Sequence, residues 1–222
     1  MEMRKLKKYL KLLTVFLLLL SSFSFSKRLE VIANEEESEG RVRFRSGSII
    51  LDFASDIYFG THAIVNEDRT FYAREPSGEA MTHFVRIIDT RGSVEGWSLR
   101  VRQNGQLTAS DASVHTDLID AQLSIVGNLS TRKESVSGVA AAGGPETFSI
   151  FLDASGASSS LIAAAGSGEG AGRWLIQHGG LDEINDERIN TNIRLFVPGT
   201  TPREAVVYTT TLTWYLVHGP EN

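Results

Sequence analysis

The stretch Glu204–Val217, EAVVYTTTLTWYLV, is the longest alternating segment in this chain of 222 residues. Side chains of a strand alternate between two faces, so every second residue shares a face. One face carries Val206, Tyr208, Thr210, Leu212, Trp214 and Leu216, while the other carries Val207, Thr209, Thr211, Thr213, Tyr215 and Val217 and is less apolar. Because aromatic and β-branched residues fit a half-buried pleated surface, the pattern predicts one long strand whose apolar row packs against a core.

The same rhythm runs through most of the chain. Short runs rich in Val, Ile, Phe, Tyr and Thr are broken by Gly, Asn, Asp and Ser. Clear examples are RVRFR (41–45), SIILDFA (48–54), HFVRIID (83–89), GWSLRVRQNG (96–105), TFSIFLD (147–153) and TNIRLFVP (191–198). Residues 127–172 are less regular. The rhythm predicts an all-β fold with little helix, a β-sandwich or partly closed barrel of about ten to twelve strands.

The first residues differ from the rest. A basic head, MEMRKLKKYLKLL, precedes a short apolar run over residues 12–25. This arrangement is typical of a secretory signal peptide, and Val31-Ile32-Ala33 predicts cleavage after Ala33. A retained N-terminal anchor is the alternative. Residues 34–40 are acidic and predict a flexible tether, which leaves residues 41–222 as one folded domain.

Composition argues against several classes of function. Removal of residues 1–33 would take seven basic and two acidic side chains from the total of 22 and 27, which changes the formal charge from −5 to −10. Such a charge does not favour nucleic acid as a partner. The chain has no Cys, and its five His residues lack metal-ligand spacing. Neither a nucleophile motif nor a phosphate loop is present, so we expect no catalytic residues, no metal and no cofactor.

One acidic segment needs separate mention. LDEINDER, Leu181–Arg188, gathers four carboxylates, which are the ligands that Ca²⁺ prefers. Its spacing matches no calcium loop, so a solvated turn is the favoured interpretation.

A second Trp-x-Leu triplet lies far upstream, where Trp97, Leu99 and Val101 alternate with Ser98, Arg100 and Arg102. Both tryptophans are predicted to lie on apolar strand rows. Packing in the core is the favoured role, because large aromatic side chains dominate core energetics. The alternative is a contact surface for a sugar ring or a partner protein.

Three segments together resemble a known family. GRVRFRSGSIILDFASDIYFGTHAI opens the domain at residues 40–64, and VRIIDTRGSVEGWSLRV at residues 85–101 carries Asp89, Arg91, Gly92, Gly96, Trp97 and Leu99. YTTTLTWYLVHGP at residues 208–220 carries Tyr208, Leu212, Thr213, Trp214, Leu216 and Pro220. In this order they resemble the WxL-domain surface proteins of Gram-positive bacteria.

The resemblance implies a non-enzymatic, secreted protein that attaches non-covalently to cell-wall peptidoglycan and works beside other surface proteins of the WxL system. No membrane span is expected once the signal peptide is removed. The candidate contacts from the motifs are Trp97, Leu99, Tyr208, Leu212, Thr213, Trp214 and Leu216. Arginines that alternate on strands are candidate contacts for anionic polymers or simply solvated faces, and they are Arg41, Arg43, Arg45, Arg100 and Arg102. The alternative function is a subunit whose main partner is another exported or membrane-anchored protein.

Overall fold

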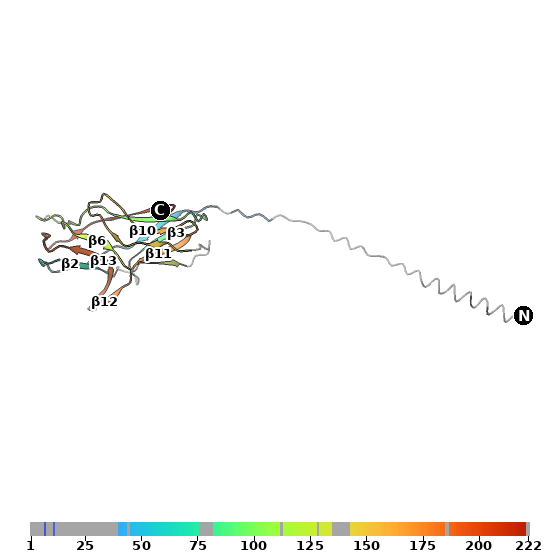
Figure 1. Ribbon diagram of the computed structural model, residues 1–222, viewed down its shortest axis with the longest axis horizontal. Helices are drawn as coiled ribbons and strands as arrows, with labels where there is room; N and C mark the ends of the chain where they lie inside the picture. The colour runs from blue at the N-terminus through green and yellow to red at the C-terminus, as the bar shows by residue number, and fades with distance from the viewer. Residues whose placement is uncertain are drawn as a thin grey trace. The chain divides into compact units, whose positions relative to one another are not determined.

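The computed structural model describes residues 7, 11, 40–43, 45–75, 82–111, 113–127, 129–134, 143–184 and 187–220. The chain separates into two compact units, Met1–Arg43 and Phe44–Asn222, and every strand of the described residues lies in the second (Figure 1). Apart from Lys7, Lys11 and Gly40, the predicted signal peptide and tether lie outside the described residues. None of the helical residues described belongs to a helix long and apolar enough to cross a membrane.

The described residues form 15 strands in four antiparallel sheets. Sheet A has the order β1 (Ile49–Ala54), β3 (Phe84–Asp89), β11 (Gly172–His178) and β7 (Leu129–Glu134). Sheet B has the order β12 (Asp182–Ile184), β13 (Glu187–Val197), β6 (Gln122–Ile125) and β9 (Ile150–Phe151), and β2 (Arg69–Arg74) also pairs with β13. Sheet C has the order β15 (Leu212–His218), β4 (Trp97–Gln103), β10 (Ser160–Ala165) and β8 (Glu146–Thr147). Sheet D pairs β14 (Tyr208–Thr209) with β5 (Thr108–Ala109).

The all-β prediction is confirmed, and the arrangement is sandwich-like. Among the described strands no sheet closes into a barrel, which decides between the two predicted architectures. Four of the 15 strands have only two residues, which explains why the count exceeds the expected ten to twelve. Figure 1 shows β2, β13 and β6 side by side, as their hydrogen-bonded pairing requires.

Two apolar clusters form the core. The larger one takes side chains from sheets A, B and C, including Val85, Trp97, Leu99, Ile125, Ile162, Ile176 and Ile193. The smaller one contains Leu107, Leu118, Ala121, Leu195 and Val197. Burial alternates along the central strands, as in β13, where Ile193 and Leu195 are buried and Arg194 and Phe196 are exposed. One face of each such strand therefore supplies the core, and the other faces solvent.

The prediction of a first strand at residues 41–45 is wrong. Arg41–Arg43 and Arg45 are outside any strand and exposed, and the first strand begins at Ile49. An alternating pattern makes a strand only where a neighbour pairs with it and its apolar face is covered. The side chain of Val42, which was expected on the apolar face of this strand, is 77% exposed.

The prediction of one long strand at Glu204–Val217 is also wrong. The segment divides into β14 in sheet D and β15 in sheet C, with a break at Thr210 and Thr211. At this break the Thr210 hydroxyl donates to the carbonyl oxygen of Gly105 (2.8 Å), and the Asn104 amide donates to the carbonyl oxygen of Thr211 (2.9 Å). Residues 104–105 connect β4 to β5, so the chain at 210–211 passes from pairing with β5 to pairing with β4. Local alternation cannot reveal this exchange of partners.

The middle of the chain is more ordered than its composition suggests. Ser160–Ala165 forms β10, which lies between β4 and β8 in sheet C. Its small side chains fit this site because Ala163 and Ala165 are fully buried opposite Leu99 and Trp97. An alanine-rich run carries little strand signal by itself, so only the neighbouring large side chains explain why it is a strand here.

Candidate functional site

The two Trp-x-Leu segments lie side by side in sheet C. β4 and β15 pair antiparallel, so that Leu99 faces Leu216 and Val101 faces Trp214. Directly opposed residues in such a pair share one face of the sheet, and this face belongs to the larger core cluster. The structure therefore makes one ladder from two motifs that are far apart in sequence.

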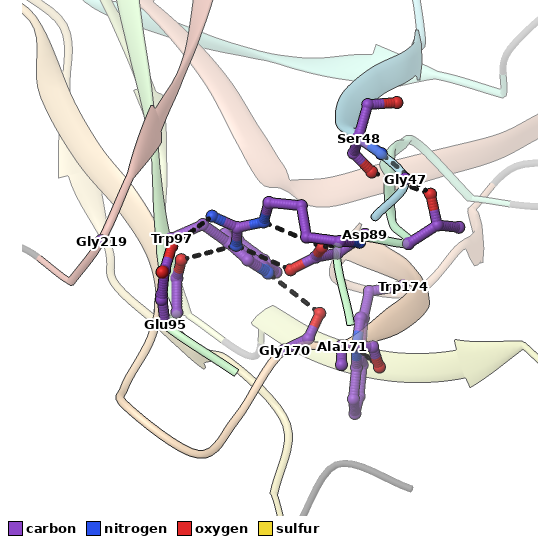
Figure 2. Close-up of polar contacts among 12 residues, drawn as sticks. Gly47, Ser48, Asp89, Glu95, Trp97, Gly170, Ala171, Trp174 and Gly219 are labelled. Carbon is purple, nitrogen blue, oxygen red and sulfur yellow. Dashed lines mark hydrogen bonds and ion pairs between the residues drawn. The ribbon is translucent and has the colours of Figure 1, made fainter. Parts of the chain in front are cut away.

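Trp97 is completely buried. Its indole Nε1 donates a hydrogen bond to the carbonyl oxygen of Gly170 at 3.0 Å, as Figure 2 shows. Gly170 has a φ of +76°, and a Cβ atom there would lie 2.4 Å from Trp97 Nε1. Leu99 is also completely buried. The core interpretation is therefore confirmed for Trp97, and Leu99, a candidate contact, is buried in the same core.

An ion pair holds the turn that leads into β4. Arg91 Nη2 donates to Asp89 Oδ2 at 2.7 Å and to the carbonyl oxygen of Gly96 at 2.9 Å, and Arg91 Nε donates to Asp89 Oδ1 at 3.0 Å. Glu95 lies on the other side of the guanidinium at 3.5 Å (Figure 2). Both side chains of the Asp89–Arg91 pair are buried, and the hydrogen bonds to Asp89 raise the pKa of Arg91 above its ordinary value.

Gly96 completes this turn. It has a φ of +80°, and a Cβ atom there would lie 2.3 Å from the carbonyl oxygen of Ala165 on β10. Only glycine satisfies both conditions. Residues of the first motif therefore act together, since Asp89, Arg91 and Gly96 fix the entry of β4, which places Trp97 in the core.

Trp214 has different surroundings. It is half-buried, and its ring stacks on the ring of His178 from β11, with centroids 5.7 Å apart and an interplanar angle of 8°. This contact links sheet C to sheet A. One side of the Trp214 ring is therefore used for packing, while part of the side chain stays open to solvent.

His178 belongs to a buried polar cluster. Asn190 Nδ2 donates to the carbonyl oxygen of His178 and, at 3.0 Å, to Thr82 Oγ1, and it lies 3.4 Å from His83 Nδ1. Burial lowers the pKa of His178 to about 3, with a smaller contribution from His83, and burial lowers the pKa of His83 to about 4. Both histidines are therefore neutral at pH 7. Their Nε2 atoms have no hydrogen-bond partner in the part of the chain that the structure describes.

The opposite face of β4 and β15 is polar. Arg102 lies over the ring of Tyr215, 5.5 Å from its centroid, and its Nε donates to Asn104 Oδ1. Arg100 donates from Nε to Ser159 Oγ at 3.0 Å and from Nη2 to the Ser159 carbonyl oxygen at 2.6 Å. The predicted alternation on β4 is confirmed for Arg100 and Arg102, which are partly exposed, whereas Ser98 at the start of the same row is buried. Arg100 and Arg102 lie on the outer face of sheet C, and their contacts with Ser159, Asn104 and Tyr215 fix their orientation.

The remaining predicted contacts are dispersed. Tyr208 lies on β14, where its hydroxyl donates to the carbonyl oxygen of His115 and accepts from the Glu204 amide. Leu212 packs against the larger core cluster, and the Thr213 hydroxyl donates to Asn104 Oδ1 on the outer face of sheet C. The structure therefore does not bring all the motif residues to one surface.

Two features of this region carried weak sequence signals. Gly170 lies in the segment GSGEGAG (166–172), where several glycines have positive φ. The high density of glycine was the only sequence feature that could have pointed to this loop.

The acidic segment predicted as a turn is a β12–β13 hairpin, in which Asp182 accepts a hydrogen bond from Thr191 and Glu187 pairs with Arg74. These described carboxylates bind other parts of the protein. No group of three potential metal ligands occurs among the described residues.

A comparison with protein families identifies the domain. The family described as "WxL domain surface cell wall-binding" matches residues 30–220. The chain belongs to the WxL family. The match includes both ladder strands and the turn before β4, so the buried Trp97 and its ion pair belong to a wall-binding WxL domain. No curated protein and no solved structure matches the chain.

Proposed function

We propose that this WxL protein is exported, has no catalytic activity and attaches non-covalently to the peptidoglycan of the cell wall. The observation that carries the proposal is the family match across residues 30–220, which includes the intact ladder of β4 and β15. The ladder supports a structural role for Trp97 and Leu99, because both are buried. Contact with the wall then belongs to outward-facing groups.

The outer face of sheet C is the first candidate for such contacts. Arg100 and Arg102 lie on alternate positions of β4, and Tyr215 and Thr213 lie opposite them on β15. A guanidinium that is oriented before binding loses little entropy when it meets a carboxylate or phosphate. Trp214 and Leu216 pack against the core from the edge strand but are only partly buried, and their exposed parts are proposed as additional contacts. Arg41, Arg43 and Arg45 precede the strands and remain candidates for contacts with anionic polymers.

Sedimentation tests the proposal. The protein, purified from expressing cells, is mixed with peptidoglycan stripped of teichoic acid and centrifuged. We expect the wild-type protein to sediment with the wall. The double variant R100Q/R102Q should bind about tenfold more weakly, because each lost charged contact costs about 0.2–1 kcal/mol at a surface and more where it is bidentate. Wild-type protein that stays in the supernatant would contradict the proposal.

A matched variant controls for charge. R173Q/R188Q also removes two surface arginines, and both are already paired, with Glu134 and Glu75. It should sediment like the wild type. Equal losses in the two double variants would show that net charge governs the binding and that the outer face of sheet C does not.

A second candidate function is that of a subunit held by another surface protein. β15 is an edge strand that pairs only with β4 among the described strands. The amide of Gly219 donates to Gly96, and the carbonyl oxygen of Thr211 accepts from Asn104. Because backbone groups alternate in direction along an antiparallel strand, those of Trp214 and Leu216 point away from β4. This open edge favours a partner that adds an extended strand.

A further inference from the structure

The outer face of sheet B carries exposed aromatic rings in a regular arrangement. Four strands pair side by side in the order β2, β13, β6 and β9. Their register defines two rows of directly opposed side chains. The first row is Tyr72, Arg194, Ser124 and Phe151, and the second is Thr70, Phe196 and Gln122.

The second row is exposed throughout. In the first row Arg194 and Phe151 are exposed and Tyr72 is half-buried, whereas Ser124 between them is only 6% exposed. Phe151 is 62% exposed and Phe196 is 38% exposed, whereas Ile150 and Leu195 beside them in sequence are buried. Adjacent strands are about 4.8 Å apart and alternate residues about 7 Å apart along a strand. The rows therefore cover an area of about 14 by 7 Å, with a phenyl ring at one end and another near the middle.

Polar side chains of these rows keep binding capacity within the described part of the chain. There the Tyr72 hydroxyl and the Gln122 side-chain amide make no hydrogen bond. Arg194 uses only its Nε, which donates to the carbonyl oxygen of Thr191 at 2.8 Å, and within the described part of the chain it forms no ion pair. In contrast, the side chains of Arg100 and Arg102 on sheet C are held by Ser159, Asn104 and Tyr215.

The chemistry of this face restricts its ligand. None of the seven residues in the two rows is acidic, although the chain has 27 acidic side chains. Arg194, which forms no ion pair among the described residues, therefore favours an anion. Exposed rings suit ring-shaped groups with one apolar side, and the hydroxyl of Tyr72 and the amide of Gln122 suit hydroxyl-rich ligands. Sugar rings in a linear chain meet both conditions.

We infer that the outer face of sheet B binds the glycan strand of peptidoglycan, with Phe151 and Phe196 stacking on sugar rings and Arg194 pairing with a carboxylate of that polymer. This inference rests on the proposed attachment to peptidoglycan and assigns the glycan contact to a surface outside the Trp-x-Leu ladder. The aromatic rings provide most of the affinity, and Arg194 selects an anionic glycan over a neutral one.

Sedimentation with two polymers tests the inference. Wild-type protein, F151A/F196A and R194Q are each mixed with teichoic-acid-stripped peptidoglycan and with chitin, a linear polymer of N-acetylated sugars that lacks carboxylates. We expect F151A/F196A to lose about tenfold or more in apparent affinity for peptidoglycan, since two ring contacts of about 0.5–1.5 kcal/mol each are removed. R194Q should weaken binding to peptidoglycan severalfold and leave any chitin binding unchanged.

Val207→Ala is the matched control, because Val207 is also 62% exposed but lies next to β14, in a different sheet. It should bind like the wild type. Val207→Ala should unfold at the wild-type temperature. F151A/F196A removes a Phe196 side chain that is only 38% exposed, so thermal unfolding is measured for each variant to show that it is folded in the binding assay.

The outcomes separate the inference from the proposed function. Wild-type protein that does not sediment with peptidoglycan would overturn the proposed function and the inference with it. Wild-type sedimentation that F151A/F196A retains in full would overturn the inference alone. A wild-type dimer that dissociates in F151A/F196A would assign the face to a second copy of the chain and would also overturn it.

Discussion

Single residues show how differently the two tryptophans of the WxL motifs are used. Trp97 is fully buried, and its one polar atom is satisfied by the Gly170 carbonyl oxygen. Trp214 is half-buried and stacks on His178. A buried indole N–H without a partner is costly, so the close approach of the loop at Gly170 is part of the Trp97 site. The motif thus depends on a glycine from a distant segment.

Gly170→Ala tests this dependence. A methyl group at position 170 would lie 2.4 Å from Trp97 Nε1 and 2.5 Å from Ala165 Cβ, in a backbone with a φ of +76°. We expect the free energy of unfolding to fall by about 2–5 kcal/mol, from backbone strain of about 1–2 kcal/mol and overpacking of about 1–3 kcal/mol. Urea denaturation followed by tryptophan fluorescence measures the change.

Gly168→Ala is the control for the backbone contribution. Gly168 has a φ of +90°, and a Cβ atom there meets nothing within 4 Å. It should lose only the strain of about 1–2 kcal/mol. If Gly168→Ala and Gly170→Ala lower the free energy of unfolding equally, the close contact of position 170 with Trp97 does not contribute to stability.

At the scale of the element, the second motif is an edge strand. Even-numbered residues of β15 direct their backbone groups away from β4, and His218 is the last of them and has an exposed side chain. Edge strands of this kind invite pairing with another chain. Proline at such a position removes an outward N–H and is tolerated best on edge strands.

His218→Pro therefore tests the partner-protein function. If another surface protein adds a strand to β15, the variant should lose about tenfold or more of its retention on cells, because a ladder hydrogen bond and the fit of the strand are both disturbed. Its sedimentation with purified peptidoglycan should not change. Cell fractionation and the sedimentation assay measure the two effects separately.

Val217→Pro provides the comparison, because the backbone N–H of Val217 points towards β4. It should destabilise the domain itself, by roughly 3 kcal/mol, and lower the midpoint of urea unfolding. If His218→Pro leaves retention on cells unchanged, β15 is not the site of a partner strand.

At the scale of the whole molecule, buried histidines connect the sheets. His83 and His178 lie beside Asn190 of sheet B, and the ring of His178, in sheet A, reaches Trp214 of sheet C. Burial lowers the pKa of these groups to about 4 and about 3, against about 6.5 in an unfolded chain. As pH falls below 6.5, the unfolded state takes up protons that the folded state does not bind, so stability decreases.

The expected result is a loss of stability between about pH 6.5 and pH 5, above the range in which unfolded carboxylates titrate. Each histidine contributes up to about 2 kcal/mol over this interval, at about 1.4 kcal/mol for each unit of pH. The midpoint of urea unfolding at several pH values measures it. His178→Phe keeps an aromatic ring for Trp214 and removes one titrating group, so its pH dependence should be about half as steep.

A pH dependence in His178→Phe as steep as that of the wild type would show that other groups govern the acid response. The lowered pKa values of Glu187 and Glu204, which follow from hydrogen bonds to Arg74 and to His115, act at lower pH than the histidines. Their stabilisation is lost only as the pH falls through the carboxylate range.

The sequence by itself determined the all-β class, the alternation on β4 and the family of the domain, because these depend on local pattern and on short motifs. Strand propensity and the period of two depend on neighbouring residues, so the apolar row of Trp97, Leu99 and Val101 could be predicted from the local sequence. The same reasoning failed at residues 41–45 and at 210–211, where the presence or change of a pairing partner decides the structure.

Only the tertiary structure decided which side chains are available for contact. Local sequence treats Trp97 and Trp214 alike, but the first lies on a central strand covered by the Gly170 loop and the second on an edge. The aromatic rows of sheet B could not be predicted from the sequence either, because Phe151 and Phe196 share one face only through the register of β9, β6 and β13. Burial and proximity depend on which strands pair, and that is set by packing across the whole domain rather than by any one segment.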